Sequence, residues 1–272
     1  MKRALLSLVL LLAACKTAPE VVADVPPPTL PDEDFTVVTQ SLTGVDVKYT
    51  GTVQAANDDI VIEKAAWEFV VDGTVKRSGE AGLNVAGKAG AQAKFELGES
   101  LVYVKDEEEL KAMDARGGSL LLALRGTLFI KAGAKTFEVP FAKSKEVRTP
   151  RLPHLKFIDF DAFRSSDVEV QAVFHLGVVN PNPFQISITG LDYTAQLAGK
   201  ELGKGTLGAG DRISPASTGV FDITVTMNDE THGKEAAKIV KSKVVPYVLN
   251  STLRAQLYSE PLENIGDIKL TK

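Results

Sequence analysis

The sequence predicts a mainly β protein made of two similar modules in tandem. Short segments in which apolar and polar residues alternate recur along the chain, and glycine, proline and asparagine separate them, as expected for strands and turns. The alternating segment at 170–178 also repeats the one at 45–53 with a shift of 125 residues. A chain of 272 residues is long enough for two domains of ordinary size.

The first residues are typical of an export signal. A basic start precedes an apolar run at 4–12, which is too short to span a bilayer. The run ends in Leu-Ala-Ala-Cys15, which resembles the lipobox of bacterial lipoproteins, where the chain is cut before the cysteine and the thiol is lipidated. We therefore expect residues 1–14 to be a signal peptide and Cys15 to be the lipid attachment site. The alternative is an ordinary secretory signal, or a buried free thiol.

The predicted anchor implies a protein that is bound to a membrane through its N-terminus without spanning it. Lys16 stands where an aspartate would signal retention in the inner membrane, so the sequence favours the outer membrane of a bacterial cell envelope, facing the periplasm. Residues 15–34 contain five prolines, which predict an extended tether at roughly 3.1 Å per residue. Because Cys15 is the only cysteine, we expect no disulfide.

The composition of the chain excludes some classes of protein. The chain is 44% hydrophobic and 24% charged, as in globular proteins, and its net charge of -4 provides no basic field for nucleic acid. Beyond the signal no apolar run reaches about 18 residues, so no transmembrane helix is expected. The proline-containing segment at 148–153 predicts a boundary between a first domain at 35–150 and a second at 153–272.

The repeat extends beyond its first strand. One extra residue in the second copy changes the shift to 126, which then holds without a gap from Ile60 to Phe95, and the shift of 125 returns at Thr127 and Leu128. The shift of 126 pairs aromatic and glycine positions: Trp67 with Tyr193, Gly79 with Gly205, and Phe95 with Phe221. Strands, turns and glycines that agree in the same order indicate an internal duplication.

Each copy has one predicted helix. Residues 106–113 and 229–240 begin with acidic side chains, which the helix dipole favours at that end. A strand is expected after each helix, at 120–130 and 248–257. We therefore predict two β-sandwiches of the immunoglobulin or fibronectin-III-like kind, each with one crossing helix.

The most distinctive motif is a turn formed by Asn180, Pro181, Asn182 and Pro183. The prolines fix φ and remove backbone donors, and the asparagines can cap local backbone groups. Together with the apolar and aromatic positions that follow, this turn resembles the type 2 late-embryogenesis-abundant family, also described as the WHy domain of water-stress and hypersensitive-response proteins. The matching positions are Ile186, Ile188, Tyr193, Gly199, Gly205 and Phe221.

The resemblance covers roughly residues 40–270, although the first copy has Ala55-Ala56-Asn57 where the prolines would be, and its assignment depends on the repeat. The resemblance implies a folded β-sandwich with a helix. It also implies a role in protection against desiccation and related stress, without catalytic activity and without a cofactor.

No pattern of catalytic or metal-binding residues accompanies these features. The three histidines, His154, His175 and His232, are not spaced as metal ligands would be. Asp159 and Asp161 could face one side of a strand and bind a cation such as calcium, but two carboxylates are too few. We favour an exposed polar face there, with Ile158 and Phe160 in the core.

Charged residues near the second predicted helix allow one further interaction. Four lysines could contact anionic lipid or glycan, although lysines near a helix end also complement the helix dipole. They are Lys234, Lys238, Lys241 and Lys243.

Two functions from different classes remain open. The first is a lipid-anchored, non-enzymatic protein that acts in stress protection. The alternative is an envelope binding module that carries an apolar ligand or docks a protein partner through its strand edges. A hydrolase would need catalytic residues that the sequence does not reveal.

Overall fold

The computed structural model describes residues 25–270, and within this range the chain is mainly β, as predicted. Cys15, the predicted signal at 1–14 and the first part of the predicted tether lie outside the described residues. The tether was expected to continue to Asp34, but a strand already begins at Thr29. This strand lies at the edge of its sheet and its register shifts around Pro31, which is where a sheet tolerates proline.

The first half of the described chain forms two antiparallel sheets, with strand orders β1-β2-β5 and β4-β3-β6-β7. Aromatic side chains from both sheets meet, since the ring of Tyr49 on β2 lies 4.8 Å from that of Phe141 on β7. The elements are β1 (Thr29–Gln40), β2 (Gly44–Gln54), β3 (Ile60–Val71), β4 (Thr74–Gly87), β5 (Gln92–Val102), α1 (Glu107–Arg116), β6 (Ser119–Ala132) and β7 (Lys135–Arg148).

The second half has the sheets β13-β9-β8 and β11-β10-β14-β15, and the short β12 also pairs with β10. Here the ring of Phe174 on β9 lies 5.2 Å from that of Tyr247 on β14. The elements are β8 (His154–Ser166), β9 (Glu169–Asn180), β10 (Ile186–Leu197), β11 (Lys200–Leu207), β12 (Arg212–Ile213), β13 (Ser217–Asn228), α2 (Asp229–His232), α3 (Lys234–Val240), β14 (Val244–Ala255) and β15 (Tyr258–Lys269).

The two halves have the same strand order, because β1-β2-β5 corresponds to β8-β9-β13 and β4-β3-β6-β7 corresponds to β11-β10-β14-β15. The paired aromatic positions also correspond. Trp67 lies opposite Gly79 on β4, and Tyr193 lies opposite Gly205 on β11. A Cβ at these glycines would come within 2.7 Å and 3.2 Å of the two aromatic side chains. Glycine on the edge strand therefore lets the neighbouring ring lie across it.

Three sequence predictions about these elements need correction. The helix predicted at 229–240 is two short helices, because Gly233 adopts a φ of 76°, which ends α2. The strand predicted to reach Leu257 ends at Ala255, and Leu257 lies in the following turn with a φ of 57°. Ile158 was expected in the core but is 41% exposed, because the register of β8 shifts between Phe157 and Asp159.

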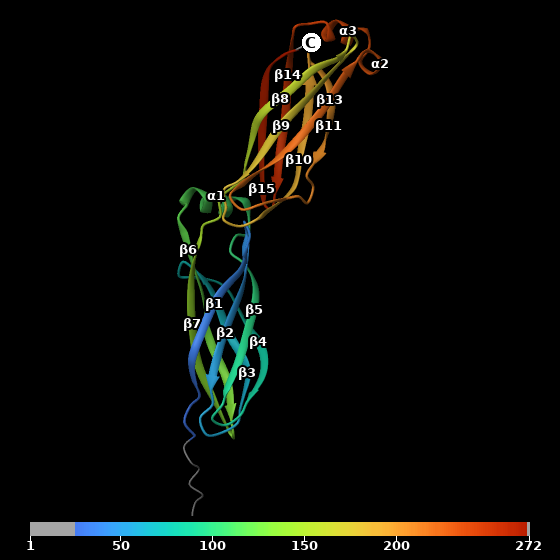
Figure 1. Cartoon of the computed structure of the whole chain (residues 1–272). Helices are drawn as coiled ribbons and strands as arrows, with labels where there is room; N and C mark the ends of the chain where they lie inside the picture. Colours follow the sequence, from blue (N-terminus) through green and yellow to red (C-terminus); the bar gives the residue numbers. More distant parts are fainter. Residues whose placement is uncertain (1–24, 271–272) are drawn as a thin grey trace, which may run out of the picture.

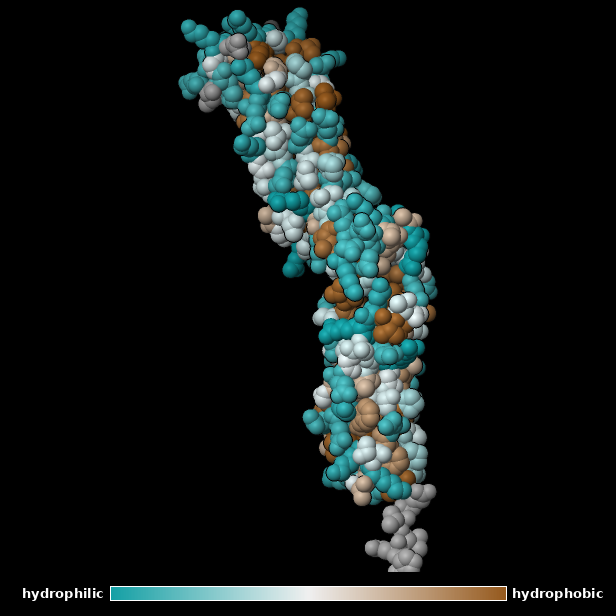
Figure 2. Space-filling model, turned by 180° about the vertical axis from the view of Figure 1, so that it is seen from behind, coloured by the Kyte–Doolittle hydropathy of each residue, from teal (hydrophilic) through white to brown (hydrophobic). Residues whose placement is uncertain are grey.

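The two halves follow each other end to end in an elongated molecule (Figure 1). Helix α1 lies where they meet, and α2 and α3 lie at the opposite end of the second half. Hydrophilic residues cover much of the face shown in Figure 2, with hydrophobic ones in separate patches. No helix among residues 25–270 is long and apolar enough to cross a bilayer.

Candidate functional site

The predicted Asn-Pro-Asn-Pro turn is held by its own asparagines. Asn180 ends β9, and the side chains of Asn180 and Asn182 are both buried. The Asn180 amide nitrogen donates to the backbone carbonyls of Phe184 at 2.8 Å, Ser214 at 3.0 Å and Ile213 at 3.2 Å. Its amide oxygen accepts from the backbone N–H and the side-chain amide of Asn182, at 3.0 Å each. Asn180 therefore caps three backbone carbonyls, of which those of Phe184 and Ser214 lie outside the strands.

The two prolines occupy the exposed positions between the asparagines. Pro181 and Pro183 face solvent, whereas Asn182 between them is fully buried. Because proline has no backbone N–H, these positions need no hydrogen-bond acceptor from the protein. In this motif, buried asparagines that cap backbone groups thus alternate with exposed prolines that make the turn rigid.

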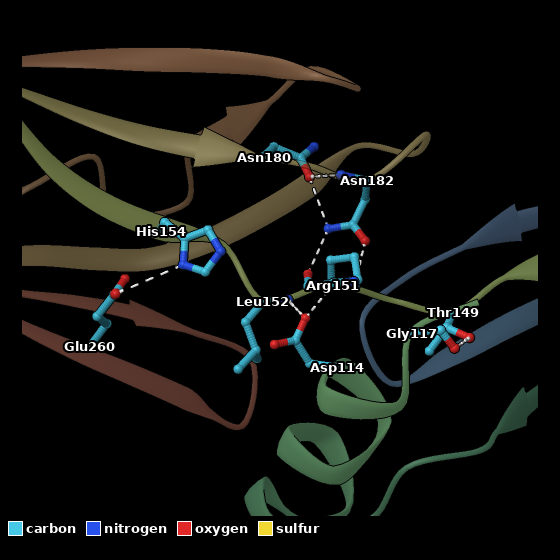
Figure 3. Close-up of polar contacts among 9 residues, drawn as sticks. All are labelled: Asp114, Gly117, Thr149, Arg151, Leu152, His154, Asn180, Asn182 and Glu260. Carbon is cyan, nitrogen blue, oxygen red and sulfur yellow. Dashed lines mark hydrogen bonds and ion pairs between the residues drawn. The ribbon is translucent and has the colours of Figure 1, made fainter. Parts of the chain in front are cut away.

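Asn182 also connects the turn to the segment between the halves (Figure 3). Its amide nitrogen donates to the carbonyl of Arg151 at 2.8 Å, and its amide oxygen accepts from the backbone N–H of Arg151 at 2.7 Å. The side chain of Asn182 therefore pairs with one residue as a neighbouring strand would. This contact places the turn of the second half directly on the connecting segment.

The connecting segment in turn contacts α1 of the first half. The Asp114 carboxylate accepts from the Arg151 Nε at 2.7 Å and from the backbone N–H of Leu152 at 3.1 Å. Asp114 is 19% exposed, and Arg151 is 51% exposed. The aspartate, the connecting segment and Asn182 thus form one polar network from α1 to the end of β9, which we call the junction network.

Flanking residues fix both ends of the connecting segment. The backbone N–H of Thr149 donates to the carbonyl of Gly118, and its hydroxyl donates to the carbonyl of Gly117, both at 3.0 Å. On the other side, the N–H of Leu155 donates to the Glu260 carboxylate at 2.7 Å, and His154 lies 3.9 Å from the same carboxylate. The segment predicted as a boundary is therefore hydrogen-bonded along most of its length.

The pKa of Tyr258, at the start of β15, depends on charged residues at the junction of the two halves. Burial raises the pKa of its hydroxyl to about 12, and the negative charges of Glu260, Asp114 and Glu107 contribute to the rise. Two of these acids belong to α1 of the first half. The β14–β15 turn of the second half therefore lies close to α1.

The other residues singled out in the sequence lie elsewhere. His175 on β9 lies between two aspartates, with its Nδ1 2.7 Å from Asp222 and its Nε2 3.4 Å from Asp161. The hydrogen bond with Asp222 is the main cause of a raised His175 pKa. Asp159 is exposed beside them. Within residues 25–270 no three His, Cys, Asp or Glu side chains are placed to hold a metal ion.

Sequence reasoning identified the asparagines but not their partners. Arg151 and Asp114 were not predicted, because neither stands in a recognisable motif. A possible signal was the proline-flanked position of Arg151 in the predicted boundary. A hollow of about 300 Å³ lies beside the junction, between the β1–β2 turn and the start of β10, and it was not foreseen either.

Comparison with protein families supports the class that the turn indicates. The model of the late embryogenesis abundant protein family matches residues 175–260, about a third of the chain. The match includes the Asn180–Pro183 turn and continues through β10 to β14. Residues 40–174 lie outside it. No curated protein shows a significant match.

Comparison with solved structures finds only proteins of low similarity to this chain. A solution structure from Arabidopsis thaliana has 21% identity over 45% of this chain and 87% of that one, with a TM-score of 0.35. A crystal structure of a protein from Archaeoglobus fulgidus has 15% identity over 43% of this chain and 98% of that one, with a TM-score of 0.31. Red sea bream transglutaminase has 11% identity over 89% of this chain and 31% of that one, with a TM-score of 0.27. These scores are too low to support an argument about function.

Proposed function

We propose that this chain is a non-enzymatic, lipid-anchored protein of the bacterial cell envelope that protects against desiccation or related stress. It carries two tandem late-embryogenesis-abundant modules of the immunoglobulin or fibronectin-III-like sandwich kind, each with a helical segment between two strands. The observation that carries the proposal is the family match over residues 175–260, which contains the Asn180–Pro183 turn.

The strand order supports extending the proposal to the first half. Apart from the short β12, the sheets of the two halves have corresponding strands, and Trp67 and Tyr193 occupy the same position relative to an edge-strand glycine. The helical segments also correspond, since α1 lies between β5 and β6 while α2 and α3 lie between β13 and β14. A divergent copy that keeps the same strand order is what a duplication produces.

We expect the folded surface of the protein, and not a reactive group, to provide the protection. Each half contributes buried aromatic and aliphatic side chains to a hydrophobic core, which favours the folded state. Its net charge of -4 favours solubility and keeps neighbouring molecules apart. Such a surface can separate partly unfolded proteins and so slow their aggregation.

A drying experiment tests the protective role. The full chain carrying Cys15→Ser is mixed with a labile enzyme, the mixture is dried and rehydrated, and the recovered activity is compared with that from an equal mass of an inert globular protein. We expect greater recovery with this chain. Phe174→Ala, which empties a fully buried position, should reduce the protection, whereas Phe163→Ala, at a position 43% exposed, should not. Recovery no better than with the inert protein would exclude the protective role.

Location needs a separate test. The anchor is tested by palmitate labelling and membrane fractionation of cells that express either the wild type or Cys15→Ser. We expect the label and membrane sedimentation to be lost in the variant. Persistent sedimentation after a carbonate wash would argue against lipidation and leave the protective role unaffected.

A further inference from the structure

The end of the second half that lies farthest from the junction gathers lysines. Helix α3 ends there, β14 begins there and β15 ends there (Figure 1). We call these lysines the basic tip; they are Lys238, Lys241, Lys243 and Lys269. All four are exposed.

Backbone contacts hold this end of the molecule in place. The N–H of Leu270 donates to the carbonyl of Lys243 at 3.1 Å, so β15 ends beside the start of β14. Arg164 on β8 donates from Nε to the carbonyl of Val240 at 3.0 Å and from Nη2 to that of Ser242 at 3.4 Å. The guanidinium therefore fixes the end of α3 while the lysine side chains extend into solvent.

The ammonium groups of the basic tip lie beyond ion-pair distance of the acidic side chains in the described chain. None of its four lysines forms an ion pair with another residue of the 25–270 range, whereas several other exposed lysines do, such as Lys64 with Glu80 and Lys88 with Asp59. Acidic residues also lie near this end, since Asp229 and Glu230 belong to α2, Asp167 follows β8 and Asp267 stands two positions before Lys269 on β15, but none of them forms an ion pair with the four lysines. Because clustered like charges repel one another, an external anionic surface would complement them.

An apolar side chain lies within the basic tip. Val244 follows Lys243 and is paired with Lys269 across β14 and β15, yet it is 47% exposed. An exposed valine next to two lysines suits a bilayer interface, where the apolar group enters the headgroup region and the ammonium groups meet lipid phosphates. A soluble polyanion would use the charges alone.

We propose that the basic tip docks on the surface of a bilayer that contains anionic headgroups. This inference stands independently of the lipid anchor. The described chain begins at the end of the first half away from the junction, so the tip and the N-terminal end lie at opposite ends of the molecule (Figure 1). Two successive lengths of about 12 strand residues separate them by about 80 Å. A molecule anchored through its N-terminus would thus present the tip to a second membrane surface.

Vesicle flotation tests the proposal. The full chain carrying Cys15→Ser, which excludes an acyl chain, is mixed with vesicles of phosphatidylcholine alone or with added phosphatidylglycerol. In the tip variant all four lysines of the basic tip are changed to glutamine. The control variant carries the same change at four exposed lysines of the first half, which also have no ion pair in the described range: Lys94, Lys131, Lys143 and Lys145. The residues before the first strand are the same in every protein, so differences in binding report on the substituted lysines.

We expect the tip variant to lose about tenfold or more in affinity for the phosphatidylglycerol vesicles, whereas the control variant changes little. High salt should remove the difference between the wild type and the tip variant. Val244→Ser should weaken binding to these vesicles without weakening binding to heparin.

Three results would overturn the proposal. The first is an equal loss of affinity in the tip and control variants, and the second is a difference between the wild type and the tip variant that is as large on vesicles of phosphatidylcholine alone. The third is capture by heparin without binding to the phosphatidylglycerol vesicles, which would identify a soluble polyanion as the partner. Urea unfolding of each variant verifies that the substitutions leave the fold intact.

Discussion

Replacing Asn182 with alanine should weaken the second half and its attachment to the first. The side chain is buried and makes three hydrogen bonds, two to the backbone of Arg151 and one to the amide oxygen of Asn180. A neutral hydrogen bond contributes about 1 kcal/mol, and a buried group left without a partner costs more. We therefore expect the free energy of unfolding of the second half to fall by about 3 kcal/mol.

The chain provides its own probe for this experiment. Trp67 is the only tryptophan and lies on β3, so its fluorescence reports on the first half, whereas circular dichroism reports on both halves. In urea, the dichroism transition of Asn182→Ala should begin at a lower concentration than in the wild type, and the Trp67 transition should move less. Asn250→Ala, at an exposed strand position, should change the free energy of unfolding from either transition by less than about 0.5 kcal/mol. If Asn182→Ala behaved like Asn250→Ala, the proposed role of the junction network would be wrong.

Three further predictions concern packing and charge. Phe95→Ala should cost about 3 to 5 kcal/mol, measured by Trp67 fluorescence in urea, because Phe95 is buried in the first core; no loss would contradict the packing of β5. Gly126→Ala should destabilise by about 2 kcal/mol or more, because its Cβ would come 2.0 Å from the Ala66 carbonyl oxygen, whereas Gly98→Ala, with nothing nearer than 4.0 Å, should not in the same assay. His175 has a pKa raised chiefly by Asp222, so its contribution to stability is fully present below about pH 6.5 and is lost as the pH rises through the folded-state pKa. The difference in thermal midpoint between the wild type and Asp222→Asn should accordingly shrink from pH 6 to pH 9, and a difference that did not change with pH would exclude this role for His175.

Local patterns predicted the strands well where alternation was strict. The segments at 45–53 and 170–178 lie within β2 and β9, and their apolar residues are buried. Prediction was less accurate where a strand departs from regular pairing. Ile158 is the residue without a register partner at a shift in β8, and Pro31 lies at a register shift in an edge strand, so neither position behaves as its local sequence suggests.

Helix prediction shows the same limit. The acidic start of α1 was recognisable, and Asp106 caps the helix by accepting from the N–H of Glu109 at 2.8 Å. The second helical segment has a similar acidic start, but Gly233 divides it. Helix periodicity indicates which residues can be helical, whereas the backbone conformation that one glycine adopts depends on how its neighbours pack.

The sequence by itself determined the mainly β character, the internal correspondence of the two halves and the position of the Asn180–Pro183 turn, because alternation and turn chemistry are properties of neighbouring residues. Only the tertiary structure decided what the turn binds. Asn182 and Arg151 are 31 residues apart, and Arg151 and Asp114 are 37 apart. Such contacts arise when separate sheets and a helix come together, and the sequence carries no periodic signal of them. The basic tip likewise exists only because β14 and β15 bring Lys243 and Lys269 to the same end of the molecule.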